Sequence, residues 1–147
     1  ATLGPDPLRA DADPQQFIAE LGRRRGPIGA VLLDQRVIAG VGNVFRAEAL
    51  FAAGLHPARA ADSLTRVEAD RLWAMISAML ADGLRHGRIV TVDPRDVGAS
   101  DVEGVPDDDR MLVYKRGDLP CRRCGAPIAS RQLGGRTIWL CPGCQQG

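Results

Sequence analysis

The stretch CRRCGAPIASRQLGGRTIWLCPGC, residues 121–144, contains all four cysteines of the chain. They form two Cys-x-x-Cys pairs, Cys121 with Cys124 and Cys141 with Cys144, which 16 residues separate. A two-residue gap lets both thiolates of a pair reach one ion, and the intervening residues are enough for a hairpin that returns the second pair to the first. The spacing therefore predicts one structural Zn²⁺ with four thiolate ligands and no open position for catalysis.

Other uses of these cysteines make different demands. A four-thiolate iron site has the same spacing and stays open on sequence grounds. Disulfides need an oxidising compartment, and no signal peptide is visible. A thioredoxin-like redox site needs a single Cys-x-x-Cys beside a βαβ unit. Zinc is favoured, and because residues 110–147 hold few large apolar side chains, we expect their fold to depend on the metal while the preceding helices persist without it.

Charge is unevenly distributed in a chain whose formal net charge is only +1. Residues 93–109 carry seven acidic side chains and one arginine, a net charge of −6, whereas residues 110–147 carry seven basic side chains and one acidic, a net charge of +6. This pattern is compatible with a solvated loop beside a soluble tail, but it favours a zinc hairpin that binds a polyanion. No apolar run approaches the roughly 18 residues of a membrane span, so no membrane partner is expected.

Helix signals dominate residues 14–92. Residues 1–13, rich in proline, glycine and aspartate, are typical of a linker, and Asp13-Pro14 then predicts the N-cap and first turn of a helix that ends at Gly22 or Gly26. A capping box, Thr65 with Glu68, opens the longest predicted helix. The other helices are predicted over residues 27–33, 43–53 and 66–86.

The helical periodicity stops after residue 92. Residues 93–109 are predicted to be a mobile acidic linker, and residues 111–114 a short strand. Residues 128–131 and 136–140 are predicted hairpin strands, with Leu133-Gly134-Gly135 in the turn. The expected fold is mainly α: a four-helix module, a linker and a small β-hairpin zinc finger over residues 110–147.

Two features carry binding chemistry. Gly40-Val41-Gly42-Asn43 directly precedes a predicted helix, where backbone N–H groups and the helix dipole suit one phosphate, although simple capping by Asn43 is an equally good explanation locally. Arg136 follows the hairpin turn, and a rigid hairpin that projects one arginine can clamp a phosphate or stack on a base. A solvated arginine is the alternative there.

These segments together resemble a known family. The run LDQRVIAGVGNVFRAEAL, residues 33–50, resembles the helix-two-turns-helix motif of formamidopyrimidine-DNA glycosylase and endonuclease VIII. Residues 113–144 resemble the C-terminal zinc finger of that family, including the 16-residue gap, and residues 3–8 resemble its interdomain linker. The resemblance covers nearly the whole chain, and residues 43–48 and 139–142 are most similar to the endonuclease VIII branch.

The resemblance implies roles for individual residues. Asn43, with the backbone at Gly42, would bind the DNA backbone near the lesion, and Arg25 would contact it elsewhere. Arg136 would grip the phosphates flanking the damaged nucleotide, and the family also gives this position a part in δ-elimination. The family often has lysine where this chain has Gly29, which implies one contact fewer.

The resemblance also implies a parent enzyme, a bacterial, cytoplasmic and nucleoid-associated DNA glycosylase/AP lyase. Such an enzyme excises oxidised bases from damaged double-stranded DNA in base excision repair. Its catalytic N-terminal proline and the adjacent glutamate belong to an N-terminal domain that this chain lacks, so the chain is expected to be a monomeric, inactive DNA-binding half. Two other classes stay open: an RNA-binding helix-two-turns-helix protein and a zinc ribbon that binds proteins.

Overall fold

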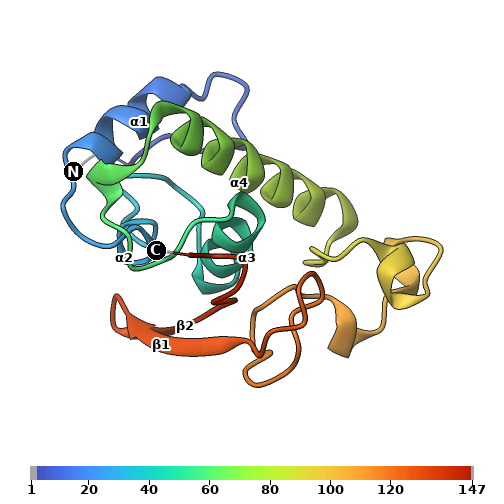
Figure 1. The fold of residues 1–147 in the computed structure, drawn as a ribbon. Coiled ribbons are helices and arrows are strands. Elements are labelled where there is room, and N and C mark those ends of the chain that lie inside the picture. Colours follow the sequence, from blue (N-terminus) through green and yellow to red (C-terminus); the bar gives the residue numbers. More distant parts are fainter. Residues whose placement is uncertain (1–2, 147) are drawn as a thin grey trace.

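The computed structural model describes residues 3–146, so the first two residues of the predicted linker and the last residue of the predicted finger lie outside the described range. Four α-helices come first, and a two-stranded antiparallel sheet ends the chain (Figure 1). The elements are α1 (Pro14–Gly22), α2 (Ile28–Val31), α3 (Asn43–Ala53), the 3-10 helix η1 (Ala61–Ser63), α4 (Arg66–His86), the 3-10 helices η2 (Pro94–Val97), η3 (Val102–Gly104) and η4 (Asp107–Asp109), β1 (Ala129–Leu133) and β2 (Arg136–Leu140). The mainly α fold predicted from the sequence is confirmed.

Local signals explain where the helices begin and end. The Asp13 side chain accepts a hydrogen bond from the backbone N–H of Gln15, with proline in the first turn of α1. Thr65 and Glu68 form the predicted capping box of α4. Gly54 ends α3 and Gly87 ends α4 in the left-handed conformation, which glycine adopts at little cost.

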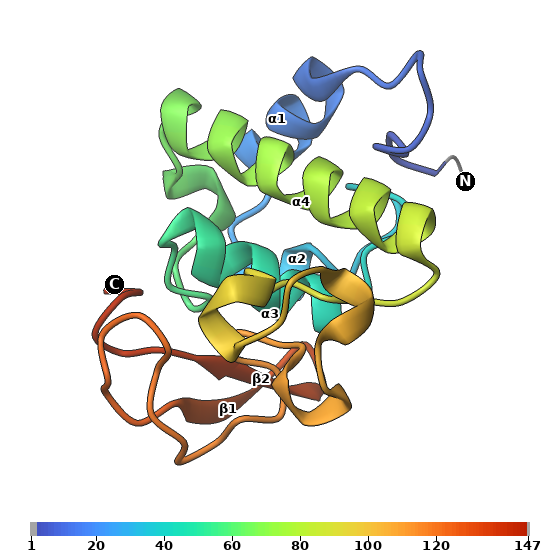
Figure 2. The ribbon, with the colours of Figure 1, turned by 90° about the vertical axis from the view of Figure 1, so that its right-hand side faces the viewer.

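Helix α3 is the centre of the molecule. Figures 1 and 2 both show it between α4 and the hairpin, and it contacts both. One continuous apolar core includes Phe17, Leu50 and Ile76 of the helices together with Ile128 and Ile138 of the hairpin. Helices and hairpin are therefore packed as one body around α3.

The segment between α4 and the finger, predicted to be an acidic linker, contains η2, η3 and η4 and is held by side-chain contacts. Arg88 holds it: its guanidinium donates to the carbonyl oxygens of Glu103 at 3.3 Å and Val105 at 3.0 Å, and to Asp107 Oδ1 at 3.2 Å. The Val105 side chain is buried. The Asp101 side chain caps η3. An acidic side chain of this segment therefore has a structural role that the composition did not reveal.

The strand predicted over residues 111–114 is absent, because its backbone N–H groups bond to a side chain instead of a neighbouring strand. Glu48 of α3 accepts from the N–H groups of Leu112, Val113 and Tyr114. The hairpin prediction holds, with β1 beginning and ending slightly later than expected. Leu133 and Arg136 are partners in its register, and the two glycines between them both have positive φ, as the tight turn requires.

The chain before α1 is fastened to the loop that follows α2. The backbone N–H of Gly4 donates to the Gln35 carbonyl oxygen at 2.7 Å, and the N–H of Ala39 donates to the Pro5 carbonyl oxygen at 3.0 Å. A Cβ on Gly4 would lie 2.5 Å from the backbone of Val37, so only glycine permits this contact. Over residues 3–146, none of the helices has the length and apolar character needed to cross a membrane.

Candidate metal centre and nucleic-acid interface

The structure brings the four cysteines together. Their sulfur atoms all lie within 4.8 Å of one another, and none is in a disulfide. Backbone N–H groups point at two of them, from Arg123 to Cys121 Sγ at 3.3 Å and from Cys144 to Cys141 Sγ at 3.4 Å. Four thiolate donors in one cluster, supported by N–H groups that favour the charged sulfur, fit a structural zinc ion.

The second cysteine pair is tied to the end of α3. Gln145 is fully buried; its side-chain oxygen accepts from the backbone N–H of Cys141 at 2.8 Å and its amide donates to the Leu55 carbonyl oxygen at 3.0 Å. A Cβ on Gly143 would lie 3.0 Å from Cys124 Sγ, so this position has little room for a side chain. Neither residue was singled out from the sequence, since glutamine near a chain end carries no pattern.

Both arginines that lie between the cysteines of the first pair make structural contacts. Arg122 donates to the Met111 carbonyl oxygen at 3.1 Å and to Asp109 Oδ1 at 3.4 Å. The Arg123 guanidinium lies over the ring of Phe51 in α3, 4.7 Å from its centroid. Arg123 therefore joins the finger to the helical module and Arg122 joins it to the acidic segment, so part of the basic charge counted in the sequence is already engaged.

Arg46 of α3 is fully buried and, within residues 3–146, has no carboxylate partner. Its guanidinium donates to three carbonyl oxygens, those of Gly29 at 2.7 Å, Leu133 at 2.9 Å and Arg136 at 3.4 Å. It also donates to Asn43 Oδ1 at 2.8 Å. Burial, together with the nearby charge of Arg136, lowers the pKa of Arg46 to about 10.

Asn43 lies at the first position of α3, and its side chain does not cap the helix. Instead its amide nitrogen donates to the Thr137 carbonyl oxygen at 2.9 Å, 94 residues away. The local explanation of Asn43 as a capping residue is therefore wrong. The contact places Asn43 beside the residue that follows Arg136, so two of the residues singled out from the sequence lie together.

Arg136 is exposed, and among the described residues no acid pairs with it. Arg131 on β1 is exposed in the same way. Burial lowers the pKa of His56, and the charge of Arg131 lowers it further. The hairpin therefore presents positive charge that no carboxylate of residues 3–146 neutralises, which is an arrangement suited to an anion.

Gly42 and Arg25 are placed less tightly. Gly42 is the exposed N-cap residue of α3 with an extended backbone, so its N–H lies at the positive end of that helix. The N–H of Gly40 is already bonded to Gln35 Oε1 at 3.0 Å and is less available to a ligand. Arg25 is exposed on the loop between α1 and α2, and the structure shows no contact that joins it to Asn43 or Arg136.

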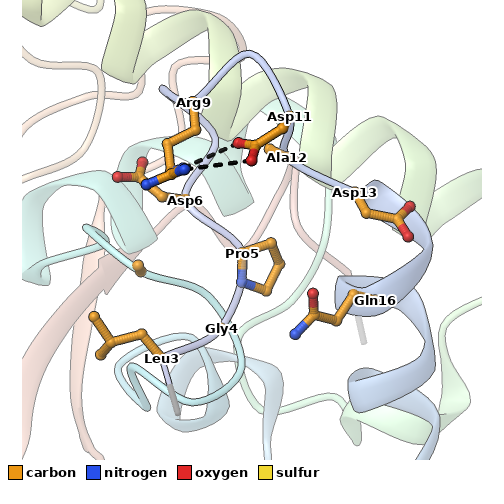
Figure 3. A pocket seen from close by; sticks show the side chains of 10 residues that line it. Leu3, Gly4, Pro5, Asp6, Arg9, Asp11, Ala12, Asp13 and Gln16 are labelled. Atoms are coloured by element: carbon orange, nitrogen blue, oxygen red, sulfur yellow. Dashed lines mark hydrogen bonds and ion pairs between the residues drawn. The ribbon is translucent and has the colours of Figure 1, made fainter.

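A pocket of about 390 Å³ between residues 3–13 and the start of α1 contains none of these residues (Figure 3). Its rim carries Asp6, Asp11 and Asp13, and its only basic residue, Arg9, pairs with Asp11 at 3.0 Å. An acidic pocket repels anions. The binding surface indicated by charge is the hairpin with the start of α3.

The fold and the site define a protein made of a helical module followed by a small four-cysteine finger. Comparisons with known proteins identify both parts. Residues 3–94 match the model described as the formamidopyrimidine-DNA glycosylase H2TH domain, and residues 118–147 match the zinc finger found in FPG and IleRS. The chain belongs to the formamidopyrimidine-DNA glycosylase family, as the resemblance in its sequence implied. With the four clustered sulfurs, the finger match confirms one structural zinc site.

Similar proteins agree with this assignment. The chain is 44% identical to Endonuclease 8 1 of Mycobacterium bovis over 99% of its own length and 54% of that relative. It is 41% identical to the formamidopyrimidine-DNA glycosylase of Nitratidesulfovibrio vulgaris over 98% of its length and 38% of that relative.

Solved structures of relatives have the same fold. The crystal structure of MutM (Fpg) from Thermus thermophilus matches with a TM-score of 0.80 and 39% identity, over 97% of this chain and 53% of the other. The complex of Lactococcus lactis Fpg with DNA containing an abasic site matches with a TM-score of 0.79 and 27% identity, over 99% of this chain and 52% of the other. The chain thus spans about half the length of these relatives.

Proposed function

We propose that this chain is the DNA-binding half of a bifunctional DNA glycosylase/AP lyase that acts on oxidised bases. One observation carries the proposal: Arg136 is exposed without an acidic partner among residues 3–146, and the next residue, Thr137, accepts a hydrogen bond from Asn43 at the start of α3. An unpaired arginine on a strand that contacts a helix N-terminus is a natural site for backbone phosphates. The L. lactis relative was solved with DNA that contains an abasic site, which supports the same partner here.

Electrostatics favours a polyanion at this surface. Arg46 and Arg136 are like charges close enough for Arg136 to lower the pKa of Arg46. A phosphate bound at Arg136 would relieve their repulsion, whereas a neutral ligand would not. We assign Arg136 a phosphate contact rather than proton transfer in δ-elimination, because a guanidinium does not readily release a proton. Gly42 contributes its backbone N–H, and Arg25 is a more distant contact to the backbone.

The chain alone binds and does not cut. It spans about half the length of its relatives, and the family resemblance assigns the attacking proline amine and its glutamate to the other half. The parent enzyme, a monomer in the bacterial cytoplasm, cleaves through a Schiff base once both halves hold the lesion. Strand cleavage by the purified chain, or its trapping on DNA by borohydride, would contradict this division of labour.

The test compares three ligands at matched salt: a duplex with one abasic site, the same duplex intact, and a structured RNA. We expect tightest binding to the abasic duplex and an affinity that falls as salt rises, with a log–log slope of roughly −2 to −4 for a few phosphate contacts. Preference for the RNA would favour an RNA-binding protein. Absence of binding to all three would favour a zinc ribbon that binds proteins.

A further inference from the structure

The hairpin turn rests on the backbone of α2 at Gly29, where a side chain would meet Leu133 and Pro57. A Cβ on Gly29 would lie 2.5 Å from Leu133 Cδ2 and 3.0 Å from Pro57 Cβ, well inside normal contact distances. Gly29 is not among the residues with positive φ, so the constraint is one of space and not of backbone conformation. The next residue of the turn, Gly134, would bring a Cβ to 3.3 Å from Ala30. The turn therefore sits directly on α2.

A single nitrogen atom joins the two sides of this contact. Arg46 Nη1 donates both to the Gly29 carbonyl oxygen at 2.7 Å and to the Leu133 carbonyl oxygen at 2.9 Å. Because a guanidinium is planar and rigid, these bonds fix the distance between the backbone of α2 and the backbone of the turn. Arg46 is buried, and so is its bond to Gly29, so water does not replace that bond.

The packing of the turn on α2 also sets the position of the residues that are proposed to bind phosphate. Arg136 is the register partner of Leu133, on the opposite side of the turn. The next residue, Thr137, accepts the hydrogen bond from Asn43. We propose that Gly29 is a positioning residue: by leaving space for Leu133, it fixes Arg136 relative to the start of α3 so that both meet the DNA backbone together. This rests on the proposed function, in which Arg136 and Asn43 bind phosphates.

Two complementary substitutions test whether the packing of the Leu133 side chain against Gly29, called the seat below, positions Arg136. Gly29→Ala forces Leu133 off α2, and Leu133→Ala vacates the seat, so each should weaken binding to abasic-site duplex by roughly tenfold, the loss of one charge-assisted contact. In the double variant the methyl group added at position 29 occupies space that the leucine side chain has left, while its close contact with Pro57 remains, so affinity should recover part of that loss. Gly22→Ala is the control, because a Cβ on this helical glycine would meet no neighbouring atom within 4 Å; its affinity should not change.

A second measurement separates positioning from a general loss of stability. Arg136→Ala is introduced into the parent chain and into the Gly29→Ala variant, with zinc content and helical circular dichroism checked in each. If Gly29 positions Arg136, removal of the arginine should cost roughly tenfold in the parent and less than about threefold in Gly29→Ala. Equal costs in the two backgrounds, or parent-like affinity of a folded, zinc-loaded Gly29→Ala chain, would overturn the proposal.

The seat can also be observed without DNA. The side-chain amide of Asn43, which bonds to Thr137, gives NMR signals that should shift and lose protection in Gly29→Ala and return toward the parent in the double variant with Leu133→Ala. Unchanged Asn43 signals in Gly29→Ala would refute the seat. If the parent chain bound no DNA while these signals moved as expected, the proposed function would be wrong. The role of Gly29 in positioning the hairpin relative to Asn43 would still be supported.

Discussion

The Glu48 carboxylate accepts a hydrogen bond from the backbone N–H of Val113, 65 residues further along the chain, at 2.8 Å. The neighbouring N–H groups of Leu112 and Tyr114 donate to the same carboxylate at 2.6 and 2.9 Å. Glu48 is fully buried, and the Thr91 hydroxyl is a further donor. A side chain of α3 thus replaces the partner strand that residues 112–114 would otherwise need, and it fixes the chain where it enters the finger.

Glu48→Gln should destabilise the fold strongly. The amide keeps one acceptor oxygen but turns an NH₂ group toward backbone donors, so at least one buried N–H loses its partner. Hydrogen bonds to charged groups contribute about 1.5–3 kcal/mol each, and we expect a loss of about 3 kcal/mol or more in the free energy of unfolding by urea. Glu103→Gln is the control, because that side chain is 64% exposed and should change stability by less than about 0.5 kcal/mol.

Zinc removal should weaken the helices as well as the finger. The sequence suggested that the helices would persist without metal, but the apolar core runs without a break from α1 and α4 to Ile128 and Ile138. Structural zinc supplies on the order of 10 kcal/mol of apparent binding free energy, which a single body shares. Chelation should move one cooperative transition, followed by helical circular dichroism, to lower urea. Two separate transitions, with the helical one unmoved, would show that the units are independent.

Asn43→Ala should weaken DNA binding without the cost of a lost helix cap, since Gly42 is the N-cap residue of α3. The variant loses the hydrogen bonds to Thr137 and Arg46, so we expect a stability loss of about 1–2 kcal/mol and at least a several-fold loss of affinity. Thermal unfolding and binding are measured on the same sample. Full affinity at low salt would remove Asn43 from the phosphate site.

Glu68 should make α4 sensitive to acid. Hydrogen bonding to Arg59, and then to the Thr65 backbone, lowers the pKa of Glu68 from 4.5 to about 2. A lowered carboxyl pKa stabilises the fold above pH 4.5, and that contribution is lost as the pH falls toward 2. Glu68→Gln should therefore be less stable than the parent by about 1 kcal/mol at pH 6, with the difference shrinking below pH 4.5.

The comparison is made as a difference between two proteins because acid also releases zinc from the cysteines. That loss affects the parent and Glu68→Gln alike and cancels. A difference in unfolding free energy that stayed constant from about pH 6 down to about pH 3 would show that Glu68 contributes through its shape and not through its charge.

Features set by neighbouring residues were predictable from the sequence. Thr65 and Glu68, which form the capping box of α4, lie three positions apart, and the cysteine spacing predicts the four ligands of the metal site. The roles of Arg46 and Glu48 were not predictable, since charged residues in a helix are ordinarily exposed. Most of their partners are backbone atoms, up to 90 residues away, which carry no side-chain signature. The same limit explains the strand wrongly predicted over residues 111–114.

The contacts of the acidic segment were not predictable for a related reason. Its composition is that of a solvated linker, but Arg88, which lies outside the segment, collects two of its carbonyl groups and one carboxylate. Of the predicted phosphate contacts, the structure brings Asn43 and Arg136 together through Thr137. Their DNA contacts stay predictions until binding is measured.

The most direct test of the DNA-binding claim is the salt dependence of binding to abasic-site duplex for the parent chain and Arg136→Ala. Loss of one phosphate contact should weaken binding by roughly tenfold at low salt and make the log–log slope shallower by about 1. Arg71→Ala, exposed on α4, should leave both unchanged. If Arg136→Ala has the affinity and the slope of the parent, the hairpin does not bind the DNA backbone and the central claim is wrong.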